Sequence, residues 1–292
     1  MRKLISALLM TLLVQSVALA QMPDWIMVRD PDGNRYYVDP NGKIYTSGKP
    51  EFDYKAVSES GVAFYFNQGV ELLKGGYKFE GLSLLKSIMA MPSTAGKTSD
   101  YRSKASFEIN RLIKKEGDRY AELDRNASIL LYRQEEAVVL INDLMRYRIE
   151  FPGEATVLRR RTRGNGKYRY YGLLAGVRFS GSIAGSDSSA YDALIAIDSE
   201  RFPSNISNMT ALKNNWAKNL GADSFQRTPL HTGEREDLTR FDDGADYGGF
   251  EGFYLRGRYG YCVRIITAGS ERAKNMALME KMMQSFRLSF PD

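Results

Sequence analysis

Apolar and polar residues alternate with helical spacing through the first half of the chain and with strand spacing through much of the second half. The stripe from Val62 to Leu73 repeats every three or four positions, which predicts an amphipathic helix that ends at Gly75-Gly76. A second stripe from Phe79 to Met89 stops before Pro92, where a helix cannot continue. Together the two stripes predict a helical hairpin.

Two longer helices are predicted after this hairpin. Ser99 or Asp100 is suited to cap a helix whose apolar stripe runs from Tyr101 to Tyr120. The segment from Asn126 to Tyr147 carries apolar residues on one side at helical spacing, which predicts a further helix. A proline and a glycine then end the helical region, which we place at residues 54–153.

Strand signals dominate residues 154–292. The alternation of strands with two helices predicts an antiparallel sheet packed with helices, so the expected fold class is α+β. The expected strands are Tyr168 to Ser180, Tyr191 to Ile197, Phe250 to Leu255 and Tyr259 to Thr267, and the expected helices are residues 207–220 and 270–286.

Residues 21–53 have a third pattern, in which two similar turns separate short β-branched and aromatic runs. Asp30-Pro-Asp-Gly-Asn and Asp39-Pro-Asn-Gly-Lys recur at a spacing of nine residues, which predicts a three-stranded β-meander. A cation site is the alternative, although the bidentate glutamate of a calcium loop is missing. Its ligands would be Asp30, Asp32 and Asn34, and the residues that make the meander a candidate contact arm are Trp25, Tyr36 and Tyr37.

The first twenty residues have the pattern of an export signal. Arg2 and Lys3 precede an apolar run from Leu4 to Val17, and Ala18-Leu19-Ala20 resembles a cleavage site. We expect cleavage after Ala20 and a periplasmic protein. Membrane insertion is not expected, because no later segment has the roughly 20 apolar residues of a transmembrane helix.

Composition narrows the chemistry. Hydrophobic residues make up 43% of the chain and charged residues 26%, as in ordinary folded proteins, and the net charge of +6 is too mild to favour nucleic acid as a partner. The one cysteine, Cys262, is expected to be buried on a strand, and the one histidine, His231, to lie in a surface loop. We therefore expect no metal site, no cofactor and no catalytic set.

Carboxylates are the remaining candidates for acid-base chemistry. Asp237, Asp242, Asp243 and Asp246 cluster before a glycine-rich stretch. Glycosidases hold two such groups across a cleft at a set separation, which this segment does not display. The cluster is therefore interpreted as a turn-rich loop, and an enzyme acting on cell-wall glycan is kept as a third hypothesis.

The densest positive patch lies early in the C-terminal region. Arginines precede the turn Gly164-Asn165-Gly166, and basic residues alternate with tyrosines after it, which places charges and rings on opposite faces of a strand. Phosphate, sulfate, an acidic protein surface, an anionic polysaccharide or a lipid headgroup would fit such a patch, and a hairpin with solvated arginines is the alternative. The candidate interaction residues are Arg159, Arg160, Arg161, Arg163, Lys167, Tyr168, Arg169 and Tyr170.

Two parts of the chain resemble known families. Residues 62–92, with Gly69 and Gly81 at close-packing positions and Gly76 at the turn, resemble a single tetratricopeptide repeat. The stretches Gly260 to Thr267 and Met279 to Leu288, with the Ser285-Phe286 pair, resemble the carboxyl end of PsbP-like domains. The second resemblance implies a binding or assembly module.

The order of these parts behind an export signal is similar to that of the flagellar-coiling proteins, which coat the periplasmic flagella of spirochaetes. This resemblance implies a non-enzymatic structural protein of a flagellar filament sheath, needed for filament shape and motility, with flagellin and further sheath proteins as partners. The alternative hypothesis is a soluble periplasmic module that binds a small or lipidic ligand in a concave apolar pocket.

Overall fold

The computed structural model describes most of the chain beyond residue 55, together with three short strands near the N-terminus. The described residues are 26–29, 35–38, 44–45, 56–92, 97–164, 169–179, 191–205, 208–216, 226–242, 247–268 and 272–289. The expected export signal at residues 1–20, Trp25 and the cation alternative at Asp30, Asp32 and Asn34 lie outside them.

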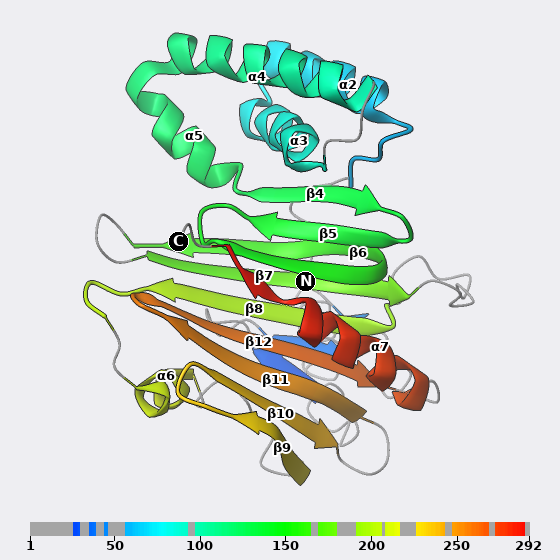
Figure 1. Ribbon diagram of the computed structural model, residues 1–292, viewed down its shortest axis with the longest axis vertical. Helices are drawn as coiled ribbons and strands as arrows, with labels where there is room; N and C mark the ends of the chain where they lie inside the picture. The colour runs from blue at the N-terminus through cyan, green and yellow to red at the C-terminus, as the bar shows by residue number, and fades with distance from the viewer. Residues whose placement is uncertain are drawn as a thin grey trace, which may run out of the picture.

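An α+β fold is confirmed, built on one large antiparallel sheet below a layer of helices (Figure 1). The strand order is β4-β5-β6-β7-β8-β12-β11-β10-β9, and the short strand β13 pairs with β6. The strands are β4 Ile129–Gln134, β5 Ala137–Asn142, β6 Tyr147–Arg163, β7 Arg169–Phe179, β8 Ala193–Arg201, β9 Gln226–Thr232, β10 Glu236–Asp242, β11 Tyr247–Arg256, β12 Tyr259–Ala268 and β13 Arg287–Leu288.

The N-terminal meander is confirmed as a separate antiparallel sheet of three strands. These strands are β1 Ile26–Arg29, β2 Arg35–Val38 and β3 Ile44–Tyr45. Tyr36 and Tyr37 lie next to each other on β2, where they pair with Val28 on β1 and with Met27 and Tyr45 on the two neighbouring strands.

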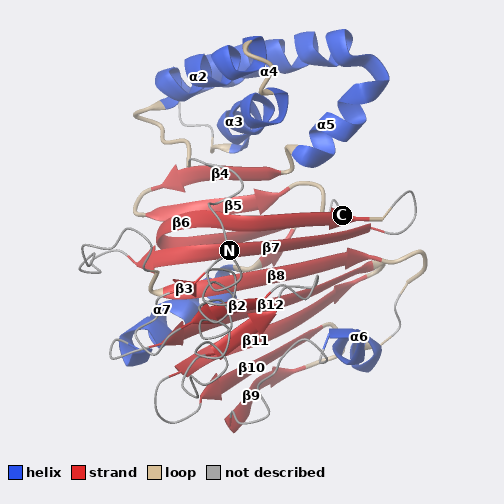
Figure 2. Ribbon diagram, turned by 180° about the vertical axis from the view of Figure 1, so that it is seen from behind, coloured by secondary structure: helices blue, strands red, loops and turns tan. Residues whose placement is uncertain are grey.

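The helical layer lies beyond strand β4 (Figures 1 and 2). Its expected first hairpin is confirmed, and Gly81 allows the two helices to approach, because a Cβ atom there would lie 2.7 Å from the carbonyl oxygen of Gly69. The left-handed φ of +90° at Gly76 forms the turn. The elements are α2 Val62–Lys74, α3 Lys78–Ala90, α4 Lys97–Glu116, the 3₁₀ helix η1 Gly117–Arg119 and α5 Tyr120–Asn126.

The predicted helix from Asn126 to Tyr147 is wrong, because this segment forms the β4–β5 hairpin. Residues Ile129 to Tyr132 are all buried, so both sides of the strand are covered and its apolar run has no alternation. Glu135, with a φ of 54°, makes the tight turn between the two strands. The predicted boundary between residues 153 and 154 is also wrong as a structural division, since β6 runs through it and pairs with both β5 and β7.

The free edge of β4 is sealed by the helical layer. The Ser83 hydroxyl on α3 donates to the carbonyl of Ile129 (2.6 Å), and the Ser87 hydroxyl accepts from the amide of Leu131 (3.1 Å). Val57 continues this edge, since its amide donates to the carbonyl of Leu131 and its carbonyl accepts from the amide of Arg133. Helices and sheet are thus joined by buried hydrogen bonds.

Two C-terminal helices cover the sheet, as expected. Helix α7, Arg272–Ser285, packs Met276, Met279 and Met283 into the main core, which also contains Tyr261 from β12. Helix α6, Met209–Trp216, packs against the other face, where Leu212 lies over Gly260. The described part of the chain contains no helix long and apolar enough to cross a membrane.

Candidate functional site

The two side chains best suited to nucleophilic or base chemistry lie apart. Cys262 is fully buried on β12, and burial raises the pKa of its thiol well above the ordinary value. His231 is exposed, as expected, although it lies on the edge strand β9 rather than in a loop. Within the described ranges, no three histidine, cysteine or acidic residues are placed to hold a metal ion.

The acidic cluster is not a loop over its described part. Asp237 and Asp242 lie on β10, whereas Asp243 and Asp246 are outside the described residues. Asp237 is buried and pairs with Lys213 of α6. Buried and exposed residues are mixed along β10, and its outer neighbour β9 is fully exposed. The interpretation as a turn-rich loop is therefore corrected for residues 236–242.

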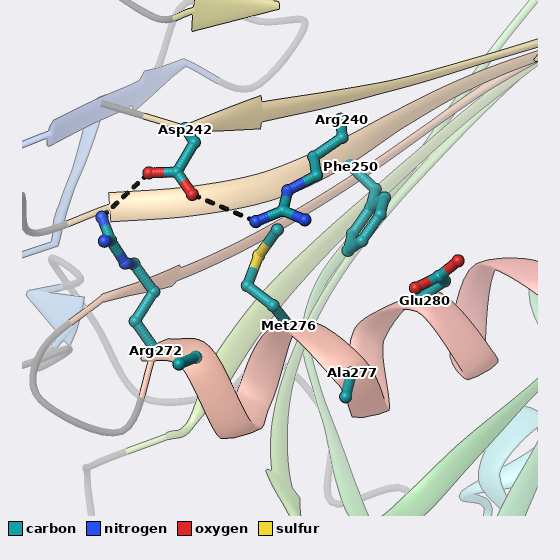
Figure 3. A pocket seen from close by; sticks show the side chains of 8 residues that line it. Arg240, Asp242, Phe250, Arg272, Met276, Ala277 and Glu280 are labelled. Atoms are coloured by element: carbon teal, nitrogen blue, oxygen red, sulfur yellow. Dashed lines mark hydrogen bonds and ion pairs between the residues drawn. The ribbon is translucent and has the colours of Figure 1, made fainter. Parts of the chain in front are cut away.

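A cavity of about 270 Å³ lies between α7 and strands β10 and β11 (Figure 3). The carboxylate of Asp242 lies between two guanidinium groups, 3.0 Å from Arg272 and 3.4 Å from Arg240. Phe250 and Met276 supply an apolar side, and Glu280 lies further along the helix. Two cations and two anions balance here, so the cavity suits a small, partly apolar ligand better than a strongly charged one.

The predicted basic patch does not form one surface. Arg161 lies opposite Gly172 on β7, whereas Arg160 lies on the other face, with its guanidinium 5.1 Å from the ring of Phe79 on α3. A bulge precedes Arg159, and Arg163 is exposed at the end of β6. Lys167 and Tyr168 are not among the described residues, and neither is the side chain of Arg159.

Tyr170 is a core residue rather than a surface residue. It is only 6% exposed, and its hydroxyl donates to Asp198 at 2.6 Å. Asp198 also lies 3.7 Å from Arg264, whose Nε donates to Glu251 at 2.8 Å. Burial lowers the pKa of Arg264, but the nearby carboxylates outweigh it and hold that pKa above the ordinary value. This network holds four strands together, and it removes Tyr170 from the candidate contact residues.

The structure brings Arg169 together with residues that the sequence did not connect to it. Arg169 on β7 lies directly opposite Arg201 on β8, and Arg201 lies directly opposite Tyr259 on β12. The guanidinium carbons of Arg201 and Arg146 are 5.9 and 6.0 Å from the centre of the Tyr259 ring. We call Arg125, Arg146, Arg169, Arg201 and Tyr259 the arginine cluster. Strand pairing was the missing signal, since these residues are far apart in sequence.

The outer side of the helical layer carries exposed aromatic residues. Phe64 on α2 is 64% exposed and Phe107 on α4 is 67% exposed. The two helices lie side by side, with the rings of Phe66 and Tyr101 5.5 Å apart. A shallow groove of about 70 Å³ between them has an apolar base and a largely basic rim; it is lined by Val70, Leu73, Lys74, Glu108, Arg111, Leu112 and Lys115.

No family model and no curated protein matches this chain. A crystal structure of a protein from Bacteroides thetaiotaomicron VPI-5482 is similar to it with a TM-score of 0.26 and 9% identity. The match covers 49% of this chain and 45% of the other, so this chain spans less than half the length of that protein.

Proposed function

We propose that this protein is a non-enzymatic structural or assembly protein of the bacterial periplasm, which acts as a coat component of a flagellar filament. The exposed apolar surface of the helical layer carries this proposal. Among the described residues, five of the six large apolar side chains that are exposed belong to this layer. They are Phe64, Tyr77, Met89, Phe107 and Ile113, and only Leu230 lies elsewhere. Such side chains are typical anchors of protein interfaces.

Charge indicates what kind of protein would bind there. Helix α4 carries six basic and three acidic residues. Lys74, Arg111 and Lys115 stand around the apolar groove between α2 and α4, and Glu108 is the acidic residue among them. An acidic surface with apolar side chains would complement this rim. Under this proposal the partner is a filament protein, such as flagellin or another sheath protein, and the groove favours one with an acidic and apolar contact surface.

Co-sedimentation with isolated filaments tests the proposal. The double variant Phe64→Ser/Phe107→Ser should bind filaments at least about tenfold more weakly, because each buried phenylalanine contributes roughly 1.5–3 kcal/mol. Leu230→Ser is the matched control, since it removes an exposed apolar side chain from the opposite edge of the molecule. Two results together would refute the proposal. The wild-type protein would stay entirely in the soluble periplasmic fraction, and deletion of its gene would leave filament shape and motility unchanged.

A second candidate function is the binding of a small amphipathic ligand in the cavity of Figure 3. Its support is the combination of an apolar side, Phe250 and Met276, with the arginines at one end. Anilinonaphthalene sulfonate, an anionic aromatic dye, is a suitable probe. Ala277→Phe should fill the cavity and abolish dye fluorescence, while Ala121→Phe on exposed α5 should not. Equal fluorescence of both variants would remove this candidate.

A further inference from the structure

The arginine cluster concentrates positive charge at one end of the large sheet. Arg169, Arg201 and Tyr259 lie in one row across three neighbouring strands, so their side chains share a face. Arg146 reaches the same tyrosine ring from the turn between β5 and β6, and Arg125 approaches from α5. Arg169 and Arg201 are half-buried, whereas Arg125 and Arg146 are exposed. The cluster is therefore open to solvent on its outer side.

Within the described part of the chain, no carboxylate balances the charges of Arg169 and Arg201. Neither Arg169 nor Arg201 forms an ion pair with any described residue, and the buried Nε of Arg201 has no hydrogen-bond acceptor there. Partial burial, and then the nearby cations Arg201 and Arg125, lower the pKa of Arg169. Like charges directly opposite each other on neighbouring strands are destabilising.

Two other buried or half-buried arginines, Arg264 on β12 and Arg272 on α7, have carboxylate partners. Arg264 contacts Glu251, and Arg272 contacts Asp242. Arg169 and Arg201 differ from these two arginines, because neither has a carboxylate partner among the described residues. An unbalanced pair of half-buried cations is unfavourable on its own and becomes favourable when an anion lies between them.

We propose that the arginine cluster binds a small tetrahedral oxyanion of the phosphate and sulfate class. Guanidinium groups present planar forks of donors that match such oxygens, and the unsatisfied Nε of Arg201 adds a donor within the sheet. Tyr259 holds the guanidinium groups of Arg201 and Arg146 by cation–π contact. A dianion balances two opposed arginines, whereas a monocarboxylate balances one. The proposal is independent of any filament partner.

Thermal unfolding of the purified protein tests this. Phosphate or sulfate at about ten times its dissociation constant should raise Tm by roughly 3–6 °C over chloride of equal ionic strength. Arg169→Gln and Arg201→Gln should abolish that rise, and Arg201→Lys should keep only part of it. Arg133→Gln, which removes an arginine paired with Glu154 on the same sheet, should keep the full rise.

The change in Tm that each variant shows in chloride alone, without phosphate or sulfate, separates anion binding from a purely structural role. In chloride alone, Arg169→Gln should melt at or above the wild-type temperature, because it removes one of two opposed charges. A merely structural arginine would instead lower Tm in every buffer. Three results would each overturn the proposal: no rise beyond the chloride control, an equal rise with acetate, or an undiminished rise in both glutamine variants.

Discussion

The sealed edge of β4 gives the most direct test of how the helices and the sheet are joined. Ser87 is 2% exposed, and its hydroxyl donates to the carbonyl of Ser83 (2.8 Å) while it accepts from the amide of Leu131 (3.1 Å). In Ser87→Ala that amide stays buried without an acceptor, which costs about 1–3 kcal/mol. The gain in helix propensity returns up to about 0.5 kcal/mol, so a net loss of about 1–2 kcal/mol is expected.

Ser83→Ala removes the donor to the Ile129 carbonyl and should cost about 1 kcal/mol. The double variant should lose nearly the sum of both, because Ser87 bonds to the backbone of Ser83 and not to its hydroxyl. A loss of about 2–3 kcal/mol is a large part of the roughly 5–15 kcal/mol that stabilises an ordinary domain.

Ser103→Ala is the matched control for this experiment. Its hydroxyl also bonds to the carbonyl four residues earlier, Ser99, but on the exposed side of α4. Urea unfolding should therefore show a neutral or slightly positive effect for the control and a lower midpoint with unchanged slope for the Ser83 and Ser87 variants. Hydrogen exchange should in addition lose protection at Leu131. Equal midpoints for Ser87→Ala and Ser103→Ala would refute the reasoning.

Three further predictions concern packing, charge and pH. Gly81→Ala should cost about 1–3 kcal/mol in urea unfolding despite its better helix propensity, because its Cβ would meet backbone on α2; a neutral effect would contradict this. Glu251→Gln should cost about 3–5 kcal/mol, since it removes the nearer of the two carboxylates beside buried Arg264 and leaves Asp198 at 3.7 Å; a loss below about 1 kcal/mol would contradict it. Burial and then the carboxylate of Asp124 raise the pKa of Tyr120 from 10.0 to about 12. The folded state therefore holds this proton more tightly, and the resulting stability is lost as the pH rises from 10.0 to about 12. In an ultraviolet titration, Tyr120→Phe should show the ionisation of one tyrosine fewer than the wild type between pH 10.0 and about 12.

The sequence predicted those elements whose neighbours are also near in the chain. The hairpin of α2 and α3 is local, and its glycines at 69 and 81 mark the close approach that the structure shows. The strands β7, β8 and β12 combine apolar runs with β-branched residues, and β11 combines a buried run with aromatic residues, so burial and propensity agree. The burial of Cys262 was predicted for the same reason, because it lies on such a strand.

Elements covered on both sides were harder to predict. Strands β4 and β5 carry continuous apolar runs, because one side packs under helices and the other on the main core; Tyr132 and Val139 belong to the first set, and Leu131 and Leu140 to the second. Periodicity cannot distinguish such strands from a buried helix. The opposite failure occurred at the far edge, where β9 is exposed throughout and has no apolar face to detect.

The candidate sites could not be predicted from the sequence for a different reason. The basic patch was inferred from residues next to each other in sequence, but strand alternation sends neighbours to opposite faces, and Tyr170 is drawn into the core by Asp198. Conversely, Arg169 and Arg201 meet only because β7 pairs with β8 in one register. A shift of one residue would separate them, since it would turn every side chain of one strand to the other face.

The two ends of the sheet are built differently, and this difference bears on how the protein makes contacts. The β4 end has its backbone groups satisfied by Ser83, Ser87 and Val57, so the helical layer is fixed to the sheet by buried hydrogen bonds. The β9 end is exposed and carries Pro229, which has no amide to offer a further strand. Side chains that protrude from the helical layer are therefore held on a rigid base, which reduces the entropy lost when they bind a partner. For this reason the helical layer, rather than the open edge, is the better placed surface for the filament contact that we propose.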